Sequence, residues 1–303
     1  MGLTFADAQN LLQSRRGATG GRVVMLGRQN LLLHPGDLKR LRAAVGTDSV
    51  ALAWLQDYRW GSYADGFFRH VLKFEDVESI DYSPFEGASI IHDFGEPLPE
   101  HLQETFDLAV DGGTLEHVFN FPVAAANLMK LVRVGGIVYA ANPSNNLCGH
   151  GFYQFSPELM YRIFSPKNGF ELIFVRLLRS RYASVALSSG HAVYDVSDPA
   201  QAGGRVNLQN SKPVVIMTMA RRVRHCEPFA EKVLQSDYAR EWVSPSQDAR
   251  GLRGFVKSAV GWDTPRPWSG PIINAYLRLH ASFQNRHSFR RVRGDATLDQ
   301  RTG

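Results

Sequence analysis

Residues 106–120, FDLAVDGGTLEHVFN, place residues capable of chemistry directly after an apolar run. The run 108–110 predicts a buried strand. The residue types that follow it are acids, glycines and a histidine: Asp111, Gly112, Gly113, Glu116 and His117. Glycines let a ligand approach the backbone closely, and an imidazole exchanges protons near neutral pH. The stretch therefore predicts a ligand-binding strand end. His117 is its first candidate for a general base, or else a structural residue of the turn.

Similar residues end other predicted strands: Gly27, Asp81, Asp93 and Asp111. In open α/β sheets, ligands bind outside the carboxyl ends of the strands. An acid after the second strand can accept hydrogen bonds from both hydroxyls of a ribose, and a glycine turn after the first strand exposes backbone amides. Each acid alone could equally be a helix cap or a solvated loop residue. Together they predict a nucleoside-containing cofactor.

A second polar segment, CGHGFYQFS, follows the fifth predicted strand and should face the substrate. His150 is a second candidate base, or a histidine that fixes a glycine-flanked loop. Tyr153 and Gln154 are expected to face the substrate. Glu116 either orients a histidine or accepts hydrogen bonds within its turn.

Strands must alternate with helices to place these residues at one edge of a sheet. The predicted strands are 22–27, 77–81, 88–93, 106–111, 135–143, 170–178 and 212–223. The predicted helices are an N-terminal one, 34–45, 63–74, 121–134 and 156–165. We expect Gly135 and Gly136 to end the helix over 121–134. This alternation predicts an α/β fold with a Rossmann-like, mostly parallel seven-stranded sheet flanked by helices.

Composition limits the class of protein. The chain has 303 residues, 44% of them hydrophobic, and no apolar run long enough to span a membrane. The N-terminus lacks a signal-peptide core. Cys148 and Cys226 are far apart and show no metal-ligand spacing, so we predict no metal site. A reducing, cytoplasmic location is expected.

We divide the chain into a Rossmann-like domain over residues 1–225 and a basic extension over residues 226–303. Residues 28–76 form a helical insertion after the first strand, either a lid, part of a substrate pocket, or an ordinary surface insertion. Residues 221–303 hold 15 Lys or Arg against 8 Asp or Glu. The extension could meet an acidic partner, or simply be a solvated, helical or partly disordered surface. It lacks the aromatic-interleaved pattern of nucleic-acid binding.

Over residues 20–222 the chain resembles the class I S-adenosylmethionine-dependent methyltransferases. Five segments carry the resemblance, in the family's order: VESIDYS, IIHDFGEPLPE, FDLAVDGGTLEHVFN, LMKLVRVGGIVYAANP and HGFYQFSPELMYRIFSPKNGFEL. More narrowly, the chain is similar to a bacterial group of uncharacterised methyltransferase-like proteins.

This resemblance implies S-adenosylmethionine (SAM) as the cofactor. It implies that Asp81 binds the ribose hydroxyls and that Asp93 lies beside the adenine. Asp111, Gly112 and Gly113 would lie beside the methionine or sulfonium region.

The first-strand loop departs from the family, which usually has two or three glycines there. In LGRQNLLLHPG only Gly27 is in place, and Arg28 and Gln29 follow it. We assign all three to the cofactor site. Either Arg28 pairs with the methionine carboxylate, or the cofactor pocket is altered or lost.

The resemblance favours a SAM-dependent methyltransferase that methylates oxygen or nitrogen of a small-molecule acceptor. The alternative is a non-catalytic, methyltransferase-like binding or partner protein with an altered cofactor loop. A nicotinamide-dependent oxidoreductase would need a GxGxxG loop, which is missing after the first strand. A nucleic-acid methyltransferase ranks low, because ANPSNN only partly matches an amino-methylating motif.

Overall fold

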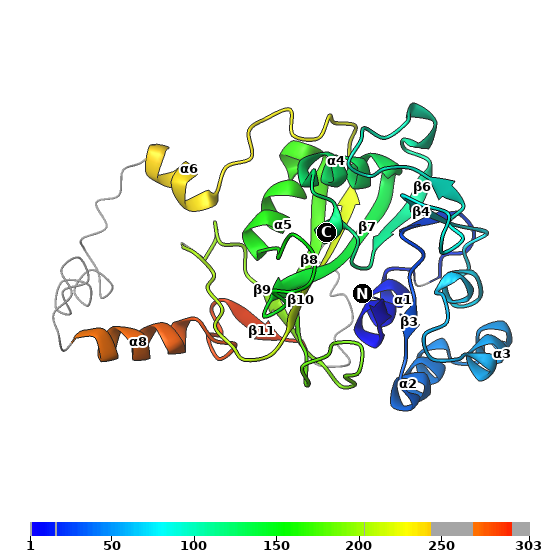
Figure 1. Cartoon of the computed structure of the whole chain (residues 1–303), viewed down its shortest axis with the longest axis horizontal. Helices are drawn as coiled ribbons and strands as arrows, with labels where there is room; N and C mark the ends of the chain where they lie inside the picture. Colours follow the sequence, from blue (N-terminus) through cyan, green and yellow to red (C-terminus); the bar gives the residue numbers. More distant parts are fainter. Residues whose placement is uncertain (1, 16, 203, 244–268, 293–303) are drawn as a thin grey trace.

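The computed structural model describes residues 2–15, 17–202, 204–243 and 269–292 (Figure 1). A nine-stranded sheet runs through the molecule. Its strands, in their order across the sheet, are β11 (Phe289–Arg291), β9 (Ala192–Val196), β8 (Phe170–Arg179), β10 (Val214–Arg222), β7 (Val132–Asn145), β6 (Phe106–Asp111), β2 (Arg22–Leu26), β4 (Asp76–Asp81) and β5 (Ile90–Ile91). A separate parallel pair joins β1 (Leu3–Thr4) to β3 (Leu31–Leu32).

The sheet has a parallel half and an antiparallel half. Strands β5, β4, β2, β6 and β7 pair in parallel. Strand β10 is antiparallel to both β7 and β8, and β9 and β11 continue the antiparallel pairing. The α/β class is confirmed, whereas the predictions of seven strands and of a mostly parallel sheet are wrong. The difference comes from β9 and β11, which the sequence analysis did not predict.

Helices cover both faces of the sheet. The α-helices are α1 (Phe5–Ser14), α2 (Pro35–Val45), α3 (Ser49–Asp57), α4 (Phe121–Leu131), α5 (Pro157–Ile163), α6 (Ser236–Val243) and α8 (Ser269–His280). Shorter helical turns are η1 (Phe67–Val71), η2 (Glu100–Leu102), η3 (Leu115–His117) and η4 (Pro166–Asn168). Figure 1 shows α1, α2 and α3 together, away from α4 and α5.

Strand β2 shows why two cores form. Its side chains alternate between the faces of the sheet, as in any strand. Val24 and Leu26 pack into the core that α4 and α5 cover, and Val23 and Met25 pack into the core beneath α1, α2 and α3. All four side chains are buried. A strand buried on both faces reads as an unbroken apolar run, and this explains why VVML was recognisable.

One local prediction is wrong, and one predicted helix is shorter than expected. Helix α4 ends at Leu131, and Gly135 and Gly136 lie inside β7 rather than at the end of the helix. The pairing register of β6 and β7 shifts in this region, between Phe106 and Leu108. The glycines thus accommodate an irregularity in a strand. The helix expected over 63–74 is present but shorter: residues 65–71 are helical, and η1 makes up most of this stretch.

The segments beyond the predicted strands add to the same sheet. Residues 179–211, a Ser/Gly-rich segment in which no strand was predicted, contain β9. Strand β11, within the predicted extension, pairs with β9. The division of the chain at residue 225 and the acidic partner stay predictions, and residues 244–268 and 293–303 lie outside the described residues. Within the described part of the chain, no helix is both long and apolar enough to cross a membrane.

Candidate active site at the carboxyl ends of the strands

Three of the predicted site residues meet at one edge of the sheet. Leu26, the last residue of β2, pairs with Ile80 in β4 and with Asp111 in β6. The Gly27 N–H donates a hydrogen bond to the Ile80 carbonyl oxygen at 2.8 Å. Asp81 ends β4 directly after Ile80. Gly27, Asp81 and Asp111 therefore lie side by side, as the parallel pairing predicts, while their binding roles stay a prediction.

A cleft of about 490 Å³ opens at this edge. Its apolar lining includes Leu26, Ile80 and Phe94. Its polar lining includes Asp81, Asp93 and His117. Asp81 Oδ1 accepts a hydrogen bond from the Tyr82 N–H at 2.6 Å, and Asp93 Oδ1 accepts one from the Gly95 N–H at 2.8 Å. Both carboxylates are thereby fixed by the backbone beside an apolar surface.

Gly27 has a conformation that favours glycine. Its φ is +65°, and a Cβ there would lie 3.2 Å from Thr114 Oγ1 and 3.9 Å from Asp81 Oδ2. The Thr114 hydroxyl donates to the Leu26 carbonyl oxygen at 2.7 Å and so joins the turn after β2 to the turn after β6. A larger residue at position 27 would push these turns apart.

Arg28 is engaged away from the cleft. Its guanidinium forms an ion pair with Asp65 at 3.2 Å, donates to the Glu86 carbonyl oxygen at 3.2 Å and stacks on Tyr63. Arg28 is not among the residues that line the cleft. Its role in this structure is to tie the loop after β2 to residues 63–65 and 86.

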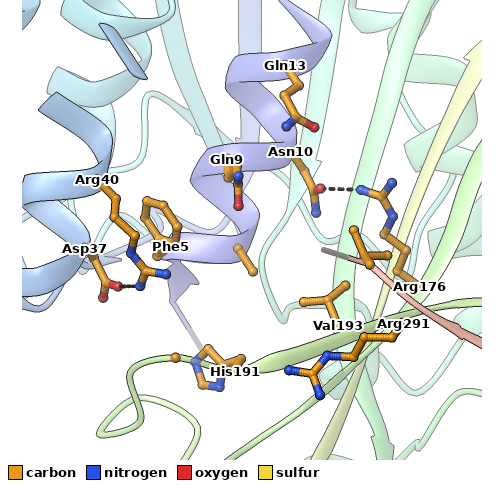
Figure 2. Close-up of a pocket in the computed structure, with 13 residues that line it drawn as sticks. Phe5, Gln9, Asn10, Gln13, Asp37, Arg40, Arg176, His191, Val193 and Arg291 are labelled. Carbon is orange, nitrogen blue, oxygen red and sulfur yellow. Dashed lines mark hydrogen bonds and ion pairs between the residues drawn. The ribbon is translucent and has the colours of Figure 1, made fainter. Parts of the chain in front are cut away.

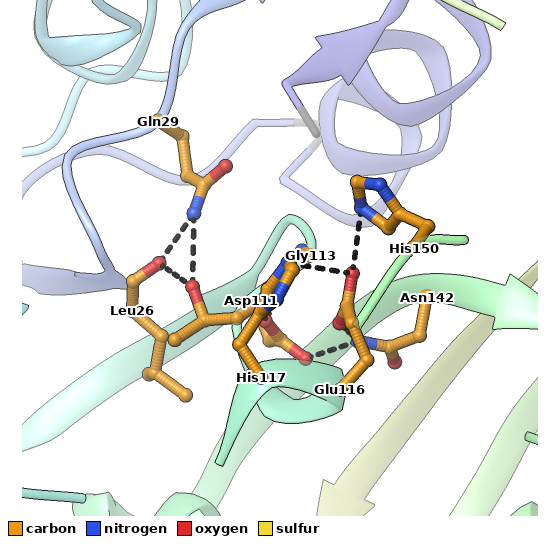
Figure 3. A network of polar contacts seen from close by, with 9 residues as sticks. Leu26, Gln29, Asp111, Gly113, Glu116, His117, Asn142 and His150 are labelled. Carbon is orange, nitrogen blue, oxygen red and sulfur yellow. Dashed lines mark hydrogen bonds and ion pairs between the residues drawn. The ribbon is translucent and has the colours of Figure 1, made fainter. Parts of the chain in front are cut away.

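Gln29 lies between the turns that follow β2 and β6. Its Nε2 donates to the Leu26 carbonyl oxygen (Figure 3). A Cβ on Gly112 would lie only 2.6 Å from its Oε1. The side chain is buried, and Oε1 has no hydrogen-bond partner among the described residues. Neither Gln29 nor Gly112 lines the cleft, so their contact with the cofactor stays a prediction.

Asp111 is fully buried at the end of β6. Its Oδ1 accepts from the N–H groups of Gly113 at 3.2 Å and Thr114 at 2.7 Å, and its Oδ2 accepts from Asn142 Nδ2 at 2.6 Å. Burial raises the pKa of Asp111, while these donors oppose the shift. The carboxylate and Gly113 therefore shape the turn that leads to Glu116.

Glu116 is a second buried acid next to Asp111. Its Oε2 accepts from the same Asn142 Nδ2 at 3.1 Å, and its Oε1 has no hydrogen-bond partner among the described residues. Burial, and after it the negative charge of Asp111, raise the pKa of Glu116 to about 7. One amide group thus serves two carboxylates.

The two predicted histidines meet at Glu116 Oε1. His150 Nε2 lies 3.4 Å and His117 Nε2 lies 3.9 Å from that oxygen. The imidazole rings contact each other edge to face, with centroids 5.1 Å apart (Figure 3). Burial lowers the pKa of both histidines, which favours the neutral imidazole at neutral pH. Of the two, only His117 also lines the cleft.

The loop after β7 carries His150 to this place because it hydrogen-bonds to η3. The N–H groups of Phe152 and Tyr153 donate to the Glu116 carbonyl oxygen at 2.7 and 3.3 Å. Gly151 has a φ of +75°, and a Cβ there would lie 2.7 Å from that carbonyl oxygen. The close approach therefore requires a glycine next to His150.

The two residues expected to face the substrate are engaged elsewhere. The Tyr153 hydroxyl donates to the Phe119 carbonyl oxygen at 2.6 Å, and its ring stacks on Phe155. Gln154 Oε1 accepts from the Leu147 N–H at 3.1 Å. Neither side chain lines the cleft. They support the loop that carries His150, and their contact with a substrate stays a prediction.

Asn142 is the residue of this cluster that the sequence analysis missed as a site residue. It lies in β7 with no exposed surface and donates to both Asp111 and Glu116. The signal was a polar residue at the end of the apolar run GGIVYAA. A buried amide in that position needs partners on a neighbouring strand.

A second cavity of about 510 Å³ lies beside α1, on the face of the sheet that α1 and α2 cover (Figure 2). Arg176 donates to Asn10 Oδ1 at 2.7 Å and pairs with Asp195 at 2.8 Å. The Tyr139 hydroxyl donates to Asp7 Oδ1 at 2.6 Å. These buried bonds fix α1 to β7 and β8. None of these bonds was predicted from the sequence.

Comparison with known proteins gives distant likenesses. The sequence matches no protein-family profile and no curated protein. A SAM-dependent methyltransferase from Thermotoga maritima is 14% identical, with 73% of this chain and 90% of that one covered and a TM-score of 0.38. The YcgJ protein of Bacillus subtilis is 11% identical, with 72% and 98% covered and a TM-score of 0.40. CalH, a trans-methyltransferase in complex with S-adenosylhomocysteine (SAH), is 12% identical, with 71% and 55% covered and a TM-score of 0.37. The structural neighbours of this chain thus include SAM-dependent methyltransferases, at low sequence identity.

Proposed function

We propose that this protein is a SAM-dependent methyltransferase that acts on oxygen or nitrogen of a small-molecule acceptor. The observation that carries the proposal is the cleft at the carboxyl ends of β2, β4 and β5, with Asp81 and Asp93 on its polar side. A cytoplasmic location stays a prediction.

The cleft suits the nucleoside half of the cofactor. Carboxylate oxygens of Asp81 can accept hydrogen bonds from ribose hydroxyls, because the residue ends β4 next to the turn at Gly27. Leu26, Ile80 and Phe94 supply an apolar surface on which a flat base can pack. Asp93, which the Gly95 N–H fixes, is available to an exocyclic amine.

The turn after β2 is the expected place for the amino-acid half of the cofactor. Gln29 Oε1 has no hydrogen-bond partner among the described residues, but neither Gln29 nor Gly112 lines the cleft, so an ammonium group could reach that oxygen only if the Gln29 side chain moved. The bound cofactor would supply an electrophilic methyl group on a sulfonium. The protein then has to align the acceptor and exclude water, which needs positioning more than covalent chemistry.

The acceptor side of the cleft is aromatic. Phe119 and Phe152 line it and are 76% and 67% exposed, and their rings contact each other with centroids 5.7 Å apart. An exposed aromatic pair at the mouth of a cleft favours a small organic acceptor with an apolar part. The predicted roles of His117 and His150 as bases stay predictions of this proposal.

A non-catalytic binding protein is the second candidate, and the loop after β2 favours it. Arg28 is paired with Asp65, and the Gln29 side chain lies against Gly112, in the region expected for the methionine. If Gln29 does not move, the amino-acid half of the cofactor has less room than a glycine loop would leave.

Calorimetric titration of the full chain with SAM and with SAH separates these candidates. The methyltransferase proposal expects both to bind one site per chain. Binding of neither by the folded protein would overturn it. Binding of adenosine but of neither SAM nor SAH would favour the non-catalytic candidate, because it would show a nucleoside cleft without room for the amino acid.

A further inference from the structure

Three side chains beside the cleft, of which His117 lines it, have the composition of a metal site. One possible ligand atom from each of Glu116, His117 and His150 lies within 4.8 Å of the other two. We propose that these three residues bind a divalent transition-metal ion.

The distances agree with shared coordination. Zinc and related ions bind imidazole nitrogen and carboxylate oxygen at about 2.0–2.2 Å, so two ligand atoms on one ion lie roughly 3–3.6 Å apart. Glu116 Oε1 and His150 Nε2 are already 3.4 Å apart. His117 Nε2, at 3.9 Å from the same oxygen, needs only a small ring movement. Its side chain is 49% exposed and has room for that movement.

The charges at the site call for a cation. Asp111 and Glu116 are fully buried and share a single amide donor, Asn142 Nδ2. Within the described part of the chain, no Lys or Arg forms an ion pair with either acid. Glu116 Oε1 and His150 Nε2 are buried and lack hydrogen-bond partners there. A buried carboxylate oxygen without a donor costs free energy that a bound cation would recover.

The ligand set indicates the class of ion. Two imidazoles and one carboxylate suit Zn²⁺, Mn²⁺, Fe²⁺ or Co²⁺, whereas Mg²⁺ and Ca²⁺ prefer oxygen ligands throughout. Three protein ligands leave at least one coordination position open. Of the three ligands, His117 lines the cleft, so we expect a molecule in the cleft to reach the ion on the side of His117.

The open coordination position favours one class of methyl acceptor. This step rests on the proposed methyltransferase function. A hydroxyl oxygen next to the cation would lose its proton to water more readily, because the cation stabilises the resulting anion. That oxygen would then form a bond to the methyl carbon while the carbon–sulfur bond breaks and its electron pair stays on sulfur. We therefore expect an oxygen acceptor rather than an amine.

The metal proposal is tested by direct binding. The full chain, freed of metal with a chelator, is titrated calorimetrically with Zn²⁺, Mn²⁺ and Co²⁺, and Co²⁺ binding is also followed by its visible absorption. We expect one site per chain. Glu116→Gln and His150→Ala should each weaken binding at least about 100-fold, since even the loss of an outer partner of a metal ligand costs about 10–100-fold.

His225→Ala is the matched control. His225 Nδ1 lies 3.0 Å from Glu104 on the surface, so it forms another histidine–glutamate pair, one outside this cluster. This variant should bind metal like the parent. Glu116→Gln keeps the shape of the side chain, and circular dichroism checks that each variant is folded.

Two results would overturn the metal proposal: no binding of these ions by the folded parent, or binding that survives both Glu116→Gln and His150→Ala. In the first case Glu116 and His150 form a proton-sharing pair instead. SAH binding, measured on the same chelated protein, is a separate readout. Metal binding without SAH binding would support the metal site and overturn the methyltransferase proposal. SAH binding without metal binding would support the methyltransferase proposal and overturn the metal site.

Discussion

Replacing Asp81 with alanine tests where the nucleoside lies. A hydrogen bond to a charged group contributes about 1.5–3 kcal/mol. Asp81 is partly exposed, and its Oδ1 already accepts from the Tyr82 N–H at 2.6 Å, so we expect the lower part of that range. A loss of about 1.5–2 kcal/mol corresponds to roughly 10- to 30-fold weaker binding of SAH.

Calorimetry with SAH on the parent and on Asp81→Ala measures this change. Asp76→Ala is the matched control, because Asp76 begins the same strand at the opposite edge of the sheet and is 64% exposed. We expect Asp76→Ala to bind SAH like the parent. An unchanged affinity in Asp81→Ala, or an equal loss in both variants, would refute the placement of the ribose at Asp81.

Three further predictions concern the stability of the fold. Tyr139→Phe removes the buried hydroxyl that donates to Asp7 Oδ1 at 2.6 Å, so urea denaturation should show about 1–3 kcal/mol less free energy of unfolding; a neutral result would mean that the Thr4 donors to Oδ2 suffice for this carboxylate. Asp48→Ala removes the cap of α3, which accepts from the Ala51 N–H at 3.0 Å, and should cost about 1 kcal/mol in the same assay, whereas no loss would show that the cap is dispensable. Burial lowers the pKa of His191 in the folded state. As the pH falls through the ordinary histidine pKa of about 6.5, the unfolded state therefore binds more protons than the folded state, and the free energy of unfolding decreases. His191→Gln should therefore lose less stability than the parent between about pH 7 and pH 5.5, and equal losses would contradict the assignment to His191.

The parallel half of the fold was predictable because its signals are local. Strand β6 occupies 106–111 as predicted, since an unbroken apolar run ends in an acid. Helix α4 begins at Phe121, where Pro122 suits a first turn. Strand β9 was missed although its burial alternates along 192–196, because it lies within a Ser/Gly-rich segment. Strand β11 consists of Phe289 and two arginines and carries no local strand signal.

The candidate site was predictable residue by residue but not as a cluster. Glu116 and His117 are neighbours in sequence, and each was recognised there. His150 reaches them only because the Phe152 N–H hydrogen-bonds to the Glu116 carbonyl oxygen, a contact between two loops that no periodicity reports. The shared donor Asn142 was missed for the same reason. Long-range hydrogen bonds, rather than residue types, bring the three metal-ligand atoms together.

The pairing of β11 with β9 has a consequence for how the chain can be shortened. The β11 register runs from Phe289 opposite Val196 to Arg291 opposite Tyr194, and Phe289 is buried in the core. A chain cut near residue 250 would lose this strand and leave the outer edge of β9 without its partner. Unpaired strand edges recruit other chains, so such a truncation should favour self-association over a smaller soluble domain. The last described strand thus covers part of the edge that β9 would otherwise expose.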